Sequence, residues 1–284
     1  METPLLSVCL ITYNHEKFIR QAIEGILMQE VNFKWELIIA DDFSTDKTRE
    51  IILEYKKQYP DFIKLIFQEK NVGPAKNWLD LISAPKSKYI AYLEGDDYWT
   101  DSLKLQKQVD FLDKNKDYNI CFHRANLLSN KGLTLHEIPT PYQSLPFDYI
   151  KLLEHYNFIT SASVVFRNPE NFVLPKCFQT LPFGDLGLLK IVSDGKKIAC
   201  INEIMSVYRI HENGVFSGLN QLNTEIKYLD FYKNIYYHLN GEEKKVVLVK
   251  IKKTLYKIAG INSKNIIISK IYYSFNLMKF YKYL

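Results

Sequence analysis

The segment Glu94-Gly95-Asp96-Asp97 places three carboxylates within four residues and is the sharpest chemical feature of the sequence. Carboxylate oxygens are the ligands that Mg²⁺ and Mn²⁺ prefer in proteins. A cation held there would neutralise a diphosphate and stabilise it as a leaving group. Gly-Asp-Asp is also ordinary turn sequence, and a solvated turn is the more frequent outcome for such a segment taken alone.

Asp41-Asp42 is a second acidic group. The Asp42 carboxylate could accept a hydrogen bond from the imide N–H of uracil or thymine, and the Tyr13 ring could stack on that base. Alternatively, both aspartates cap a helix together with Ser44 and Asp46 and interact favourably with its dipole. The pair alone leaves both interpretations open.

A third polar group is the turn Asn71-Val72-Gly73-Pro74, which precedes a predicted helix with Lys76 in its first turn. Backbone N–H groups and a cation at a helix start can face a phosphate or a base. The same sequence is common turn chemistry, so it is a weak signal by itself.

Asp185 and His211 lie much later in the chain. Asp185 follows Gly184 at the start of an apolar helix, where an aspartate is usually a cap. In a cleft it could instead act as a general base, because the helix dipole would keep it ionised. His211 follows a predicted strand, and a lone histidine there is more often a surface residue than a ligand.

Three of the four predicted strands in the first hundred residues end in polar residues, at 12–14, 41–42 and 94–97. Short apolar runs predict strands at 6–12, 35–40, 63–67 and 89–93, and the segments between them have helical periodicity, with Asn14 placed to cap the first helix. Alternating strands and helices with short turns predict a parallel sheet covered on both faces. In such sheets ligands bind beyond the carboxyl ends of the strands, where these polar residues lie.

The second half of the chain has a less regular pattern. It predicts helices at 103–115 and 185–192, strands at 120–123, 160–166 and 205–210, a loop over 126–147, and helices from about 219 onward. Ten lysines and no acidic residue lie from Lys244 to Leu284, whereas the whole chain has a net charge of +5. The first 243 residues therefore carry about −5, and the basic character belongs to the tail.

The sequence lacks the motifs that several classes of protein require. The sequence has no glycine-rich dinucleotide or phosphate loop, no Gly-x-Ser-x-Gly elbow, no paired-cysteine zinc pattern, and no nucleic-acid-binding module beside its basic tail. There is no basic start followed by an apolar stretch and no run of 18 apolar residues. The four cysteines are far apart, so we expect reduced thiols and a cytoplasmic protein.

In order along the chain, the segments 8–14, 41–46, 71–77 and 94–99, followed by Gly184-Asp185 and Tyr208-Arg209-Ile210-His211, resemble glycosyltransferase family 2. The similarity spans about residues 5–218. It implies the GT-A fold, an α/β architecture with a Rossmann-like, mainly parallel sheet flanked by helices. We expect a catalytic domain at 1–218, with a nucleotide-binding half at about 1–100 and an acceptor-binding half at about 101–218. A basic helical extension would occupy 219–284.

The resemblance also implies a role for each matching residue. The nucleotide would contact Thr12, Tyr13, Asn14, Asp42, Asn71, Lys76 and Asp96. Asp97 would hold Mn²⁺ or Mg²⁺ on the donor diphosphate with His211 nearby, while Glu94 stands where the first Asp of the common Asp-x-Asp form would be. Asp185 matches the family's catalytic base. By their positions, Trp99 and Ser161 would meet the acceptor.

The resemblance implies an inverting transferase that moves one sugar from a nucleotide sugar to a glycan or lipid-linked acceptor. UDP is the commonest nucleotide of such donors in the family. Such enzymes assemble capsule, lipopolysaccharide or glycoprotein glycans, and this chain lacks the Gln-x-x-Arg-Trp motif and membrane spans of the family's processive synthases. A nucleotidyltransferase and a catalytically silent, membrane-recruited binding subunit are the alternatives. The tail at 244–284 could lie on an anionic membrane at the inner face of the cell, or pack on the core with solvated lysines.

Overall fold

The computed structural model describes residues 3–262, except residues 156, 171, 173, 213 and 215–218. The described chain forms two compact units, which are presented separately below. The first comprises residues up to 149, 157–179 and 184–210. Within the described residues, the second comprises 150–155, 180–183 and the chain from His211 to Asn262.

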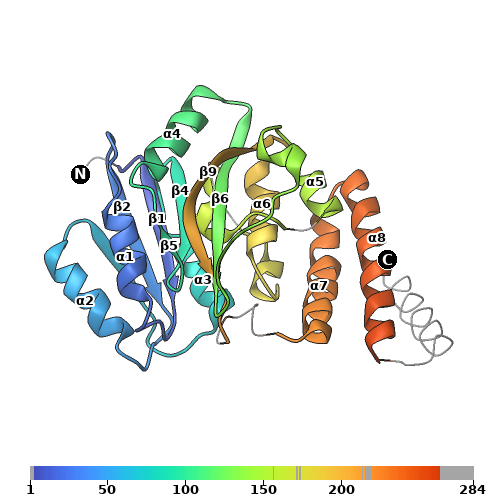
Figure 1. Cartoon of the computed structure of the whole chain (residues 1–284), viewed down its shortest axis with the longest axis horizontal. Helices are drawn as coiled ribbons and strands as arrows, with labels where there is room; N and C mark the ends of the chain where they lie inside the picture. The colour runs from blue at the N-terminus through green and yellow to red at the C-terminus, as the bar shows by residue number, and fades with distance from the viewer. Residues whose placement is uncertain are drawn as a thin grey trace. The chain divides into compact units, whose positions relative to one another are not determined.

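One nine-stranded sheet forms the first unit (Figure 1), in the order β3-β2-β1-β4-β8-β6-β9-β5 with β7 paired to β6. Its strands are β1 (Leu6–Thr12), β2 (Trp35–Asp41), β3 (Ile63–Phe67), β4 (Tyr89–Glu94), β5 (Tyr98–Trp99), β6 (Tyr118–Ser129), β7 (Gly132–Leu135), β8 (Val165–Arg167) and β9 (Lys197–Arg209). Strands β1 to β4 run parallel to one another, as do β6 and β9, whereas β8 pairs antiparallel with both β4 and β6. The predicted α/β fold with a mainly parallel sheet is confirmed.

Helices cover both faces of this sheet. They are α1 (Ile19–Leu27), α2 (Thr48–Gln58), α3 (Pro74–Ile82), α4 (Lys104–Lys114) and α6 (Asp185–Ser193), with the short 3₁₀ turns η1 (Thr140–Gln143), η2 (Ser161–Ser163) and η3 (Lys176–Gln179). Helix α5 (Tyr149–Glu154) belongs, apart from its first residue, to the second unit. Val8 and Leu10 of β1 share one buried cluster with residues of α1, α2 and α4. Because side chains alternate along a strand, Cys9 faces the other way, and its thiol lies 3.8 Å from a carbonyl oxygen of α3.

The hydrophobic periodicity explains most boundaries, and three predictions fail. Asn14 does not cap α1, because its backbone is left-handed (φ 53°) and the helix begins only at Ile19. The predicted strand at 160–166 is the turn η2 followed by the short β8, since main-chain groups of Thr160 and Ser163 bond to each other. The predicted loop at 126–147 contains the end of β6 and a hairpin to β7, whose turn needs the positive φ of Gly132.

The second unit is helical, as predicted, with α7 (Gln221–Ile235), η4 (Tyr236–His238) and α8 (Gly241–Asn262). Helices α7 and α8 run side by side (Figure 1) and are joined by an ion pair between Lys257 and Glu225 at 2.7 Å. Val247 and Ile251, which lie in the tail proposed as a possible membrane segment, are fully buried. Residues 263–284 of the predicted membrane segment lie outside the described residues.

None of the helices in the described part of the chain is both long enough and apolar enough to cross a bilayer.

Candidate active site

Three strand ends meet at one edge of the sheet. In the parallel register Thr12 at the end of β1 lies opposite Asp41 at the end of β2, and Ile11 lies opposite Glu94 at the end of β4. The polar residues that follow these strands are therefore brought together, as expected for the ligand-binding edge of an α/β sheet.

Asp41 and Asp42 have different environments. Asp41 is fully buried and engaged within the fold, since it accepts hydrogen bonds from the Arg49 guanidinium and from Ser44. Asp42 is 2% exposed, and its Oδ1 accepts a 2.7 Å hydrogen bond from the backbone N–H of Val72. Burial raises the pKa of Asp42, and this hydrogen bond opposes the shift. Asp42 thus fastens the Asn71–Gly73 turn to the site edge.

Gly95 allows the acidic segment to lie directly against the end of β1. A Cβ at position 95 would lie 2.8 Å from both Thr12 Oγ1 and His15 Nδ1. The next residue, Asp96, lies with its carboxylate 4.0 Å from His15 Nε2. Thr12 Oγ1 is buried without a hydrogen-bond partner in the described structure. The close approach therefore explains why the glycine is needed here.

Asp97 is the most deeply buried carboxylate of the segment, at 1% exposed. Its Oδ1 accepts a 2.8 Å hydrogen bond from the backbone N–H of Arg209, whereas its Oδ2 is buried and meets no hydrogen-bond donor among the described residues. Burial, and then the charges of Asp96 and Glu94, raise the pKa of Asp97 well above its usual range. A buried carboxylate oxygen in this state favours a positively charged partner.

Glu94 is contacted by a residue from the second half of the chain. Ser161 of η2 donates a 2.8 Å hydrogen bond to Glu94 Oε2. Burial and the charge of Asp96 raise the pKa of Glu94 to about 8. Ser161 is thus a partner of the acidic segment, a contact that the sequence did not suggest.

Arg209 is a site residue that the sequence reasoning missed. The pairing of β5 with β9 brings it beside the acidic segment, where its guanidinium donates to the carbonyl oxygen of Asp96. It also lies over the rings of Tyr98 and Phe18, with distances of 4.5 and 5.0 Å to the ring centroids. Its position inside the Tyr208–His211 match was the available signal.

The donor set fits a divalent cation that a substrate helps to hold. Within the described ranges, no three His, Cys, Asp or Glu side chains are grouped so that they could hold a metal ion. Mg²⁺, however, is typically bound by one or two carboxylates together with substrate phosphates. Asp97 Oδ2 and the neighbouring Asp96 carboxylate match that pattern, and a cation would relieve their mutual repulsion.

Asp185 is the first residue of α6, and its carboxylate is held in one orientation. Asn157 Nδ2 donates a 2.6 Å hydrogen bond to Asp185 Oδ2, while Oδ1 is buried with no hydrogen-bond partner in the described structure. Burial raises the pKa of Asp185, and backbone N–H groups at the helix start oppose the shift. The negative charge of Asp185 also contributes to the raised pKa of Glu94, so both carboxylates act in one electrostatic site. Asn157 lies in a loop and carries no sequence signal for this role.

Other predicted site residues lie elsewhere or are engaged. Trp99 is not an acceptor contact: it is 2% exposed in the core, and its indole N–H donates to the Ala162 carbonyl oxygen at 2.8 Å. Asn14 accepts from Thr45 N at 2.8 Å and so joins two loops. Lys76 pairs with Asp80 one turn along α3.

Tyr13 is 42% exposed, as a stacking residue requires, but no contact assigns it that role. His211 belongs to the second unit, so its predicted place near the diphosphate stays a prediction.

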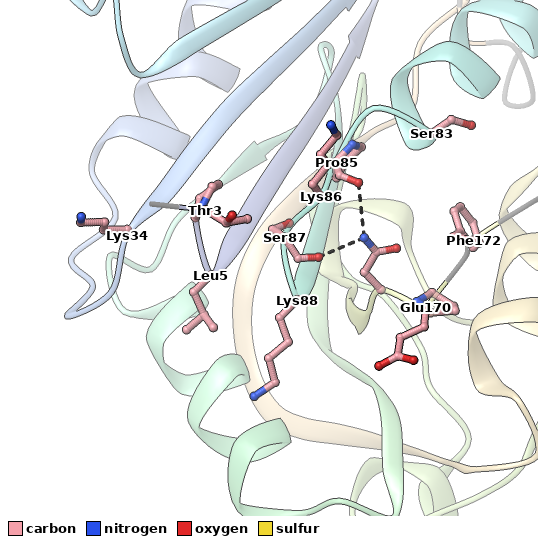
Figure 2. Close-up of a pocket in the computed structure, with 13 residues that line it drawn as sticks. Thr3, Leu5, Lys34, Ser83, Pro85, Lys86, Ser87, Lys88, Glu170 and Phe172 are labelled. Carbon is pink, nitrogen blue, oxygen red and sulfur yellow. Dashed lines mark hydrogen bonds between the residues drawn. The ribbon is translucent and has the colours of Figure 1, made fainter. Parts of the chain in front are cut away.

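A cavity of about 850 Å³ lies at the opposite end of the strands, beside Leu5 before β1 and Lys88 before β4. The side chains of Lys34 and Lys88 extend outward from its lining residues (Figure 2), and Lys88 pairs with Asp113. The cavity is therefore separate from the acidic site, and its lysines offer no converging set of charges.

Comparison with known proteins adds to this geometry. A family model described as glycosyl transferase family 2 matches residues 7–169. The chain is 38% identical over 212 residues to an uncharacterized protein of Mycobacterium tuberculosis, covering 74% of this chain but only 60% of that protein's length. It is 32% identical over 145 residues to the putative teichuronic acid biosynthesis glycosyltransferase TuaG of Bacillus subtilis, covering 51% of this chain and 56% of TuaG.

Solved structures share the fold. TarS 1–349 of S. aureus, in complex with UDP, superposes with a TM-score of 0.60 at 16% identity, over 89% of this chain and 71% of that chain. The mannosyltransferase PcManGT of Pyrobaculum calidifontis, in complex with GDP-Man and Mn²⁺, gives 0.59 at 12% identity, over 98% and 81%. These similarities confirm the predicted GT-A fold.

Proposed function

The chain belongs to glycosyl transferase family 2. On this premise we propose that it is a glycosyltransferase that moves a sugar from a nucleoside-diphosphate sugar to an acceptor hydroxyl and inverts the anomeric carbon. One observation carries the proposal. Two buried carboxylate oxygens of the first unit, Asp97 Oδ2 and Asp185 Oδ1, have no hydrogen-bond partner in the described structure. One suits the donor diphosphate with its cation, and the other suits an acceptor proton.

The nucleotide would lie at the shared edge of β1 and β2. Asp42 would accept a hydrogen bond from the base while its other oxygen holds Val72 N. The exposed Tyr13 ring would stack on the base, and Asn71 and Lys76 would complete the site. A uracil imide N–H suits the Asp42 carboxylate, and one structural neighbour is complexed with UDP, which supports a UDP-sugar donor. The other is complexed with GDP-Man, so the guanine nucleotide is the comparison to test.

The reaction would be a single displacement. As the acceptor oxygen forms its bond to the anomeric carbon, Asp185 Oδ1 takes the acceptor proton. The bond from that carbon to the diphosphate breaks, and its electron pair leaves with the diphosphate. Asn157 would keep the Asp185 carboxylate oriented throughout, because it bonds to the other oxygen at 2.6 Å. Attack from the face opposite the diphosphate inverts the configuration.

Asp97, with Asp96 beside it, would hold Mn²⁺ or Mg²⁺. A bound cation would offset the charge that develops on the departing diphosphate. Arg209 supports the site by orienting the Asp97 carboxylate. Its backbone N–H donates a hydrogen bond to Oδ1 and leaves Oδ2 available for the cation.

We further propose a glycan or lipid-linked acceptor in surface polysaccharide or glycoprotein glycan assembly. The name of the relative TuaG supports a polysaccharide acceptor. The exposed face of α8 supports a peripheral membrane contact, because Val249 and Tyr256 are 49% and 58% exposed beside the exposed Lys245 and Lys253. Sedimentation of the full chain with anionic vesicles should weaken in a Lys245→Glu/Lys253→Glu variant. Equal sedimentation of both proteins, or equal binding to neutral vesicles, would contradict the membrane contact.

The decisive experiment is a screen of UDP- and GDP-sugars with Mn²⁺ or Mg²⁺ for acceptor-dependent release of the nucleoside diphosphate. Asp185→Asn should lower kcat by about 10²-fold or more, because it removes the base but keeps the side-chain shape. Asp97→Asn should remove the stimulation of activity by Mn²⁺ or Mg²⁺, because the side chain proposed to hold the cation loses its charge. Asp194→Asn, at the other end of α6, is the matched control and should retain activity, since its left-handed backbone (φ 46°) also suits asparagine.

Each failure has a defined meaning in that screen. Release of pyrophosphate from a nucleoside triphosphate and sugar phosphate would indicate a nucleotidyltransferase. Donor binding without any turnover would indicate a binding subunit. Full activity of Asp185→Asn would remove this residue as the base.

A further inference from the structure

Trp78 of α3 forms the surface on which the residue before Asp185 lies. Its side chain is 9% exposed and stacks on Phe178 of η3, with ring centroids 6.0 Å apart and the planes 9° from parallel. A Cβ added at Gly184 would lie 3.2 Å from Cη2 and Cζ3 of the indole and 3.3 Å from Cε3. The main chain at Gly184 therefore rests directly on the far edge of the tryptophan ring.

The glycine is required by this contact and not by its backbone conformation. Gly184 has φ −97° and ψ −21°, which any residue can adopt. Its carbonyl oxygen accepts the Leu188 N–H at 2.8 Å, so Gly184 begins the hydrogen bonding of α6. Because Asp185 is the next residue, the position of Gly184 determines the position of the Asp185 main chain, from which the carboxylate extends.

The same helix α3 begins at the nucleotide side of the site. Its first residue, Pro74, follows the Asn71–Gly73 turn, and Asn77 N bonds to the Gly73 carbonyl oxygen at 3.1 Å. Asp42 fixes that turn through Val72 N at 2.7 Å. Trp78 is thus one helical turn away from the segment proposed to bind the donor.

We propose that Trp78 is a positioning residue that sets the Asp185 carboxylate, through Gly184, relative to the nucleotide turn. This inference rests on the proposed function, in which Asp185 is the base. The contact joins two segments more than a hundred residues apart in sequence, so the donor-binding turn and the base are held by one rigid element.

The test uses the full chain and begins with Gly184→Ala. The added Cβ requires a displacement of a few tenths of an ångström against the indole. A misplacement of about 1 Å lowers catalysis by about 10²-fold, so we expect kcat to fall about 4- to 10-fold, with KM for the donor unchanged within about twofold. Gly241→Ala is the matched control, because this glycine also begins a helix and its Cβ would have no neighbour within 4 Å.

Rescue separates positioning from simple loss of packing. Trp78→Phe removes the far edge of the ring but can still stack on Phe178. In the double variant Trp78→Phe/Gly184→Ala the Cβ has room, so we expect kcat to exceed that of Gly184→Ala alone by about threefold or more. The positioning role is refuted if the losses of kcat in Trp78→Phe and Gly184→Ala multiply in the double variant. It is also refuted if kcat falls only in proportion to the amount of folded protein, measured by donor binding.

A variant of the base keeps this inference separable from the proposed function. In an Asp185→Asn background, Gly184→Ala should lower kcat no further, because its effect passes through the missing carboxylate. A large loss in Asp185→Asn together with full activity of Gly184→Ala would overturn the positioning role alone. Full activity of Asp185→Asn would overturn the assignment of the base.

Discussion

Lys104 at the start of α4 offers a test of the electrostatics beneath the site. Its side chain is 0% exposed, Nζ donates to Gln108 Oε1 at 2.8 Å, and the ammonium lies 4.1 Å from the centroid of the Trp99 ring. Burial lowers the pKa of Lys104 from 10.5 to about 7. A buried lysine of this kind makes the stability of the first unit depend on pH.

The direction follows from proton binding. In the unfolded chain lysine stays protonated up to about pH 10.4, whereas folded Lys104 loses its proton above about pH 7. Between these values the unfolded state binds more protons, so the free energy of unfolding rises with pH by up to about 1.4 kcal/mol per pH unit. We therefore expect a gain of about 1–3 kcal/mol between pH 7 and pH 9.5.

Lys104→Met removes this dependence. The variant leaves Gln108 Oε1 without its donor, which lowers stability by about 1–3 kcal/mol at every pH, so the slope and not the value at pH 7 carries the test. Urea unfolding followed by tryptophan fluorescence reports on the first unit, because Trp35, Trp78 and Trp99 all lie in it. The exposed Lys114→Met on the same helix is the control. Parallel curves for wild type and Lys104→Met from pH 6.5 to 9.5 would refute the reasoning.

Three further outcomes are expected. Gly95→Ala should lower transferase activity at least about tenfold and the free energy of unfolding by about 1–3 kcal/mol, because the new Cβ would lie 2.8 Å from Thr12 Oγ1; product release and urea unfolding measure the two effects. Trp99→Phe should destabilise the first unit by about 1–3 kcal/mol in urea, since the carbonyl oxygen that meets the indole N–H at 2.8 Å loses its donor. Lys76→Ala should change stability by less than about 0.5 kcal/mol, because its ion pair with Asp80 is exposed, and a rise in KM for the donor would reveal a phosphate contact.

The sequence predicts the parallel half of the sheet well, for a physical reason. Strands buried on both faces read as continuous apolar runs, and the bounds of β1 and β3 match the predicted 6–12 and 63–67. The polar residues at the strand ends could be located for the same reason, because a strand end fixes where the next side chains lie. Asp42 and Asp97 were located in this way, whereas Asp185 was located at the start of a predicted helix.

Contacts between distant segments could not be read from local patterns. Trp99 was taken for an acceptor contact because it follows the acidic segment, but burial of its large ring and the bond to Ala162 place it in the core. Arg209 and Asn157 reach the site only through tertiary folding. Arg209 is 112 residues from Asp97 in sequence, and Asn157 lies in a loop. Neither position produces a hydrophobic periodicity from which its contact could be predicted.

The hydrogen bond from Arg209 N to Asp97 has a consequence for synthesis of the chain. The acidic segment is complete once residue 97 has been made, but the group that orients Asp97 is translated 112 residues later. At about 5–20 residues per second, the ribosome needs about 6–20 s to supply it. During that interval the nascent sheet carries its carboxylates without the strand that arranges them, so the proposed metal site is complete only when β9 is in place.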